Sequence, residues 1–158
     1  MPTIIGFVDE AYVQQQFAEH WGGVVVSVGR MYIAADVIGL GLRFDDAPPS
    51  ALVTWAEHPD GVEIVTLNAF ESGKGHGRKL LDIAEQTLKV RGADRLLLHT
   101  TNDNLGAHSV YLREGWRLVA VYPNEMDRVR AIKPTVPLVG LHGIRLQDMW
   151  RFEKHLTK

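Results

Sequence analysis

The 158-residue sequence contains no cysteine, so disulfide bonds, thiolate nucleophiles and zinc sites with cysteine ligands are excluded. It also has no apolar run near the roughly 20 residues that a membrane-spanning helix needs. Its start, MPTIIGFVDEAY, carries acidic residues and no basic cluster, unlike a signal peptide. From these absences we expect a cytoplasmic protein.

Neither sign of charge dominates the sequence. Its 17 Lys and Arg residues stand against 19 Asp and Glu residues, and the formal net charge is −2. This balance argues against a strongly basic surface for nucleic acid and against a polybasic membrane patch. We therefore expect the protein to bind neither nucleic acid nor a membrane. The length suits a single domain spanning residues 1–158, which can bury about 70% of the surface that its unfolded chain exposes.

The N-terminal third contains one clear helical pattern. Residues 9–20 place apolar side chains near one face, and Asp9 can cap the helix start. Residues 24–28 (VVVSV) are β-branched and predict a strand. Residues 31–42 are ambiguous and could hold a short turn before a strand over 40–44.

A β-hairpin is predicted in the middle of the chain. Residues 51–57 form its first strand and residues 62–70 (VEIVTLNAF) its second. The connection over residues 58–61 is a turn, because Pro59 presets φ and Gly61 accommodates positive φ.

Helices and strands alternate after the hairpin, which predicts an α/β or α+β fold with a helix crossing between neighbouring parallel strands. Residues 123–143 are expected to be a long excursion that is solvated or borders a binding site. The expected elements are a helix over 78–91, a strand over 95–101, a helix over 105–113, a strand over 116–122, a helix near 125–132 and a closing strand over 147–156.

A glycine-rich loop, Ser72-Gly73-Lys74-Gly75-His76-Gly77, joins the hairpin to the helix over 78–91. Glycines let the backbone approach a ligand closely, and a helix start offers unpaired N–H groups and the positive end of a dipole. Lys74 and Arg78 add positive charge, so the loop suits a phosphate. The alternative is a flexible turn, because the loop is neither a Walker A motif nor a dinucleotide-binding G-x-G-x-x-G motif.

The stretch from residue 63 to residue 116 resembles the acetyl-CoA-binding core of the GNAT superfamily of N-acetyltransferases. The loop and the following Leu80-Leu81 pair are similar to the family signature Q/R-x-x-G-x-G/A. A second family signature has its counterpart in NLGAHSVYLREGW. The residues that match this second signature are Asn104, Ala107, Tyr111, Gly115 and Trp116.

This resemblance implies a mixed, mostly antiparallel central sheet with helices on both faces and a splayed parallel strand pair. It implies an N-acetyltransferase that uses acetyl-CoA as cosubstrate, needs no metal, and acts on an amine of a small molecule or a peptide. A homodimer is compatible with it. Two positions depart from the family: Ser72 replaces its Gln or Arg, and His76 replaces a usually aliphatic residue, where it could pack on the helix or face solvent.

The resemblance also implies which residues bind the cofactor. Asn68 could instead be an ordinary outward-facing strand residue, and Asn104 could simply cap a helix. The implied contacts are the main chain of Leu67, Asn68 and Ala69 for pantetheine, the loop residues Ser72, Gly73, Lys74, Gly75, His76, Gly77 and Arg78 for the pyrophosphate, and Asn104 for CoA.

Glu63 is the candidate general base, because it lies on a strand among apolar neighbours, where burial would raise the pKa of its carboxyl. Its position also resembles that of the catalytic glutamate in histone-acetylating members of the superfamily. Glu63 could instead face solvent on the hairpin, with a water-relayed base elsewhere. Tyr111 resembles the family's proton donor to the leaving thiolate, with simple packing on its helix as the alternative.

Two other functions fit the same residues. A CoA- or nucleotide-binding sensor module without turnover is compatible with Ser72 at the Gln or Arg position. A structural interaction domain that uses the hairpin edge would not bind acetyl-CoA. His99, His108 and His142 lack metal-ligand spacing and are interpreted as structural or exposed.

Overall fold

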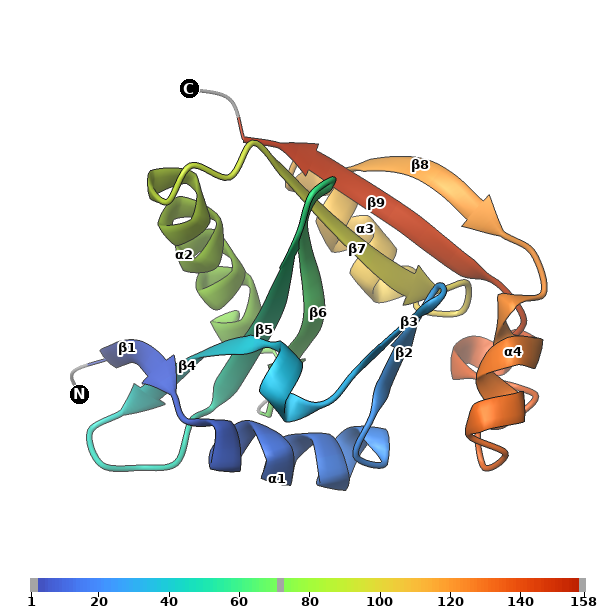
Figure 1. Ribbon diagram of the computed structural model, residues 1–158, viewed down its shortest axis with the longest axis horizontal. Helices are drawn as coiled ribbons and strands as arrows, with labels where there is room; N and C mark the ends of the chain where they lie inside the picture. Colours follow the sequence, from blue (N-terminus) through green and yellow to red (C-terminus); the bar gives the residue numbers. More distant parts are fainter. Residues whose placement is uncertain (1–2, 71–72, 157–158) are drawn as a thin grey trace.

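The computed structural model describes residues 3–70 and 73–156. A seven-stranded sheet runs in the order β1-β4-β5-β6-β7-β9-β8, and β2 and β3 form a separate hairpin (Figure 1). Only the β6–β7 pair is parallel among the paired strands of the described residues. The strands are β1 Thr3–Val8, β2 Val25–Ser27, β3 Arg30–Tyr32, β4 Ile38–Phe44, β5 Ala51–His58, β6 Gly61–Ala69, β7 Arg95–Thr101, β8 Arg117–Tyr122 and β9 Met149–His155.

Helices cover both faces of the sheet, as predicted. The helix α2 packs on the face that carries Trp55 and its β6 partner Ile64. The helix α1 packs against the opposite face, which carries Ala56. The helices are α1 Glu10–Trp21, α2 His76–Val90, α3 Leu105–Arg113 and α4 Glu125–Ile132, with short 3₁₀ turns at Ala34–Asp36 and Leu141–Gly143.

The main core lies between α2 and the sheet. Leu80, Leu81, Ala84 and Leu88 recur at helical spacing and are all buried. Burying one such leucine contributes about 1.5–3 kcal/mol, so this helix face anchors the strands around the glycine-rich loop. Within residues 3–70 and 73–156, no helix is long and apolar enough to cross a membrane.

The parallel pair β6–β7 separates along its length. Its pairing runs only from Val62↔Leu96 to Ile64↔Leu98, whereas β6 continues to Ala69 and β7 to Thr101. The far side of β6 stays paired with β5, with a bulge where Thr54↔Thr66 follows Trp55↔Ile64. The second half of β6 therefore has main-chain groups without a partner in β7, and the predicted splay is confirmed.

The N-terminal part differs most from the sequence interpretation. The strand β1 was not predicted, and it pairs with β4 at one edge of the sheet. The strand expected over 24–28 is shorter, because Val28 and Gly29 have φ of 22° and 77° and form the turn of the β2–β3 hairpin. The ambiguous segment 31–42 divides between β3, a 3₁₀ turn and β4.

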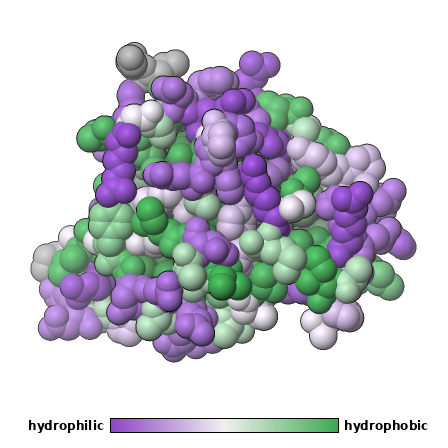
Figure 2. Space-filling view, viewed as in Figure 1, coloured by the Kyte–Doolittle hydropathy of each residue, from purple (hydrophilic) through white to green (hydrophobic). Residues whose placement is uncertain are grey.

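The excursion over residues 123–143 is partly packed. Met126 and Val129 of α4 are buried against Leu146 and Met149, so the solvated interpretation holds only for part of it. Its end exposes Leu138, Val139 and Leu141. Figure 2 shows hydrophobic and hydrophilic residues side by side over this end of the molecule.

Candidate functional site

A mostly apolar groove lies where β6, the glycine-rich loop, α2 and α3 meet. It brings together the two sequence signatures, which are far apart in the chain. Nine of the predicted site residues line it: Leu67, Ala69, Gly73, Gly75, His76, Gly77, Arg78, Asn104 and Tyr111. Leu81, Ala107 and Val110 complete its walls.

The start of α2 forms the polar end of this groove. Gly73 and Gly75 have φ of 77° and 73°, a region that residues with a Cβ rarely adopt, and Gly75 caps the helix without a side chain. The first N–H groups of an α-helix have no partner within the helix, and its N-terminus carries partial positive charge. This end of the groove therefore suits an anion such as a phosphate.

Other predicted cofactor residues have different surroundings. Asn68 pairs with Leu52 on the face of β6 opposite Leu67 and does not line the groove. Lys74 is exposed and outside the groove lining, and Ser72 lies outside the described residues. The ring centroid of His76 lies 5.1 Å from that of Phe44, so this histidine packs at the helix start.

Two residues at the groove have further contacts. Asn104 occupies the N-cap position of α3, but its side chain makes no capping hydrogen bond, so the capping alternative lacks its main interaction. Arg78 Nε lies 2.5 Å from Glu114 Oε1, which partly neutralises the guanidinium at the groove rim.

Tyr111 lies at the inner wall of the groove. Its ring centroid lies 5.8 Å from that of Trp116 and 5.6 Å from that of Phe152. Burial raises the pKa of Tyr111 to about 12, which keeps the hydroxyl protonated at neutral pH. The residue is therefore both packed in the core and able to donate a proton.

Glu63 is buried on the other face of the sheet, beneath the β2–β3 hairpin. Its exposed fraction is 1%, so the alternative of a solvent-facing strand residue is wrong. The Tyr32 hydroxyl donates to Oε1 at 2.7 Å, the Ser27 hydroxyl donates to Oε2, and His99 Nδ1 lies 3.2 Å from Oε2. Arg30 Nη1 lies 3.5 Å from Oε1.

The surroundings of Glu63 correct the expectation of an apolar cleft. Burial by itself raises the pKa of the Glu63 carboxyl, but hydrogen bonds from His99, Ser27 and Tyr32 outweigh it and lower the pKa below its ordinary value. The expected rise of this pKa is therefore wrong. Burial and the hydrogen bond to Glu63 raise the pKa of Tyr32, so at neutral pH a carboxylate faces a neutral phenol.

Sequence reasoning missed the residues around Glu63. Ser27 and Tyr32 belong to a hairpin that was only half predicted, and His99 was interpreted as structural. The Tyr32 hydroxyl also lies 2.7 Å from His58 Nε2. The available signals were Ser27 as the one polar residue in VVVSV, and His99 directly after the apolar Leu96-Leu97-Leu98 run.

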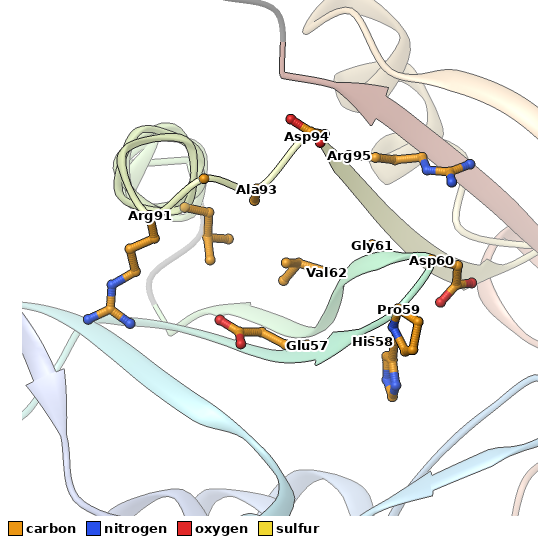
Figure 3. A pocket seen from close by; sticks show the side chains of 12 residues that line it. Glu57, His58, Pro59, Asp60, Gly61, Val62, Arg91, Ala93, Asp94 and Arg95 are labelled. Carbon is orange, nitrogen blue, oxygen red and sulfur yellow. The ribbon is translucent and has the colours of Figure 1, made fainter.

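A second hollow lies at the other end of the β6–β7 pair, between the β5–β6 turn and the connection from α2 to β7. Figure 3 shows acidic and basic side chains around it, including Glu57, Asp94 and Arg91. At its edge Gly61 has φ of 138°, and a Cβ there would lie 2.9 Å from the Arg95 carbonyl oxygen. This hollow is remote from the splay and contains none of the predicted site residues. Among the described residues, no cluster of three His, Asp or Glu side chains could hold a metal ion.

Comparisons with known proteins concern the sequence family and the fold of this chain. Residues 22–116 match the acetyltransferase (GNAT) family model. The chain is 32% identical over 151 residues to the uncharacterized protein YxbD of Bacillus subtilis (strain 168), covering 94% of each chain.

Solved structures with a similar fold include an IAA acetyltransferase from Bacillus cereus ATCC 14579, with a TM-score of 0.74, 18% identity and coverage of 98% of this chain and 99% of that one. A Bacillus subtilis acetyltransferase in complex with CoA has a TM-score of 0.73 and 18% identity, with coverage of 99% of this chain and 100% of that one. At these identities the likeness concerns the fold.

Proposed function

Since the chain belongs to the acetyltransferase (GNAT) family, we propose that it transfers the acetyl group of acetyl-CoA directly to an amine of a small molecule or a peptide. The observation that carries the proposal is the single groove that unites the helix start at Gly75 with Tyr111 and the splayed strand β6. One of the similar solved structures is described as a complex with CoA.

The parts of the groove fit the parts of CoA. We place the pyrophosphate at the first turn of α2, where glycines with positive φ leave the backbone accessible. The pantetheine amides would bond the main chain of β6 from Leu67 to Ala69, which β7 leaves unpaired. This placement directs the thioester into the splay between β6 and β7.

The chemistry needs no covalent enzyme intermediate. The nitrogen of a neutral amine attacks the thioester carbonyl carbon, a C–N bond forms, and the C–S bond breaks. The Tyr111 hydroxyl protonates the leaving thiolate, and burial keeps that hydroxyl in its protonated form. We propose that the negative charge of Glu63 drives removal of the proton that the ammonium must lose before attack.

The proposal is tested with purified protein, acetyl-CoA and a panel of alkylamines, amino acids and short peptides. Calorimetry measures acetyl-CoA binding, and a thiol reagent measures CoA release. We expect binding and amine-dependent thiol release. Binding without thiol release against any amine would favour the sensor module, and no heat with either CoA or acetyl-CoA would contradict both functions. The cytoplasmic location, the homodimer and the single domain over residues 1–158 stay predictions.

A further inference from the structure

The Glu63 carboxylate is surrounded by groups of its own chain. Oε1 accepts from Tyr32 and lies near Arg30, while Oε2 accepts from Ser27 and lies beside His99. Each of its two oxygens is therefore already in contact with two groups of the protein. A substrate amine would have to displace one of these contacts to reach it, so another group is needed between the amine and this charge.

His99 is placed to be that group, and its contacts determine where its proton lies. Nδ1 lies 2.8 Å from Ser27 Oγ and 3.2 Å from Glu63 Oε2. The Ser27 hydroxyl hydrogen is already donated to Glu63, so both atoms near Nδ1 act as acceptors. Nδ1 must therefore carry the proton, and the lone pair of the neutral ring is on Nε2.

The Nε2 atom of His99 has no hydrogen-bond partner among residues 3–70 and 73–156, although it is buried. The side chain of His99 is only 3% exposed. A buried polar atom without a partner is costly, and a role in catalysis is one reason why a native protein keeps such an atom. Its position fits this role: His99 directly follows Leu98, the last β7 residue that pairs with β6, and therefore stands where the strands separate.

We propose that His99 is the catalytic base and that Glu63 is a positioning residue that acts through it. This inference rests on the proposed function, because it concerns the amine that attacks the thioester. One N–H bond of the ammonium breaks and an Nε2–H bond forms, leaving a neutral amine and an imidazolium whose charge is balanced by Glu63. After attack, the nitrogen loses its second proton. The Tyr111 hydroxyl donates a proton to the leaving thiolate, and the proton lost by the nitrogen restores that hydroxyl. The imidazolium of His99 then releases its proton to water.

His108 provides an internal reference. It is also buried, but its Nε2 lies 2.9 Å from the Thr101 carbonyl oxygen, which can only accept. His108 therefore carries its proton on Nε2, the opposite of His99. Because the two buried histidines are expected to have opposite tautomers, a spectrum that shows which ring nitrogen carries the proton distinguishes His99 from His108.

The first arm of the test needs no acceptor. Protein labelled with ¹⁵N in the histidine rings is examined by long-range ¹H–¹⁵N correlation at about pH 8, above the ordinary histidine pKa. We expect the single proton of His99 on Nδ1 and that of His108 on Nε2. A His99 that carries its single proton on Nε2, or that stays doubly protonated, overturns the inference.

The second arm is kinetic. His99→Gln should lower kcat/KM for an alkylamine by about 10²–10⁴-fold. With hydroxylamine, which is neutral at the assay pH and needs no base, the loss should be far smaller. The control His155→Gln changes an exposed histidine at the end of β9 and should leave both rates unchanged. Equal losses with both amines would mean that His99 is merely structural.

Acetyl-CoA binding, measured on the same samples, separates this inference from the proposed function. If the wild type fails to bind acetyl-CoA, the proposed function is wrong. If the wild type binds acetyl-CoA and acetylates amines while His99→Gln keeps full activity, only the role of His99 is wrong.

Discussion

Glu63 Oε2 and His99 Nδ1 lie 3.2 Å apart, although 36 residues separate them in the sequence. The short parallel pairing of β6 with β7 brings the two strands together, and the β2–β3 hairpin closes over them through Ser27. The result is a buried carboxylate–imidazole pair on one face of the sheet, with the groove that Tyr111 lines on the other.

Replacing Glu63 by Gln keeps the size of the side chain and removes its charge. We expect turnover to fall by about 10²–10⁴-fold, chiefly at pH values below the pKa of the acceptor amine, where the base is needed. Steady-state thiol release across pH measures this loss. Glu57→Gln, an exposed glutamate on the neighbouring strand β5, is the control and should leave the profile unchanged. An unchanged profile in Glu63→Gln would remove Glu63 from the reaction.

The same substitution should change stability in a pH-dependent way. The folded-state pKa of Glu63 is lowered, so its charge stabilises the fold above the unfolded-state pKa of about 4.3. That stabilisation is lost as pH falls through the lowered folded-state value. We expect Glu63→Gln to cost about 1–3 kcal/mol in the free energy of unfolding at pH 7.

Urea unfolding of the wild type and of Glu63→Gln at pH 7 and at about pH 3 measures the difference in their free energies of unfolding. The difference in the free energy of unfolding should narrow at the lower pH. There the unfolded wild-type chain takes up a proton at residue 63, because pH 3 lies below the ordinary pKa of a glutamate, and the wild type loses part of its advantage. A gap that is the same at both pH values would mean that the charge of Glu63 does not stabilise the fold.

Removing the Tyr111 hydroxyl separates chemistry from binding. The Tyr111→Phe variant keeps the ring packed against Trp116 and Phe152 but cannot donate a proton to the thiolate. We expect the chemical rate to fall by about 10²-fold or more, with acetyl-CoA affinity nearly unchanged. Single-turnover kinetics and calorimetry measure the two quantities. A loss confined to affinity would contradict the assignment of Tyr111 as the acid.

Gly75 tests the anion site at the start of α2. Its φ of 73° makes an alanine there strained by about 1–2 kcal/mol, and the added Cβ would stand where we propose that the backbone approaches the pyrophosphate. We expect Gly75→Ala to weaken acetyl-CoA binding about tenfold or more, equivalent to about 1.4 kcal/mol, because the added methyl group would occupy space that we assign to the pyrophosphate.

Gly92, which follows the other end of α2, supplies a matched control. Its φ is 94°, and an added Cβ would meet nothing within 4 Å, as at Gly75. Gly92→Ala should therefore carry similar backbone strain and leave acetyl-CoA affinity unchanged in calorimetry. Equal affinity losses in both variants would attribute the effect to general destabilisation rather than to the site.

The residues that line the groove beside α2 could be predicted because their signals are local. Glycines at fixed spacing before an amphipathic helix indicate the loop at Gly73 and Gly75, and the second signature indicates Tyr111. The start of α2 differs by two residues from the prediction, since it begins at His76 and not at Arg78. The hairpin formed by β5 and β6 was predicted through its Pro59 and Gly61 turn.

The acid–base half could not be predicted, because its signals are distributed. Ser27, Tyr32 and His99 meet Glu63 only after a hairpin and two parallel strands have assembled. Side chains along β6 alternate between the two faces of the sheet, and the bulge shifts this alternation by one residue. The face expected for a β6 residue therefore depends on the end of the strand from which the residues are counted. Strand β9 pairs between β7 and β8, an arrangement that no local pattern indicates.

The sequence by itself determined the elements from the β5–β6 hairpin onward and the family signatures, because helical spacing, turn residues and the glycine-rich loop act within a few residues of one another. Only the tertiary structure decided that Glu63 is a charged, buried and fully hydrogen-bonded group rather than a carboxyl with a raised pKa. The physical reason is that the pKa of a buried carboxyl depends on which donors reach it. Those donors come from segments whose meeting depends on the packing of the whole sheet.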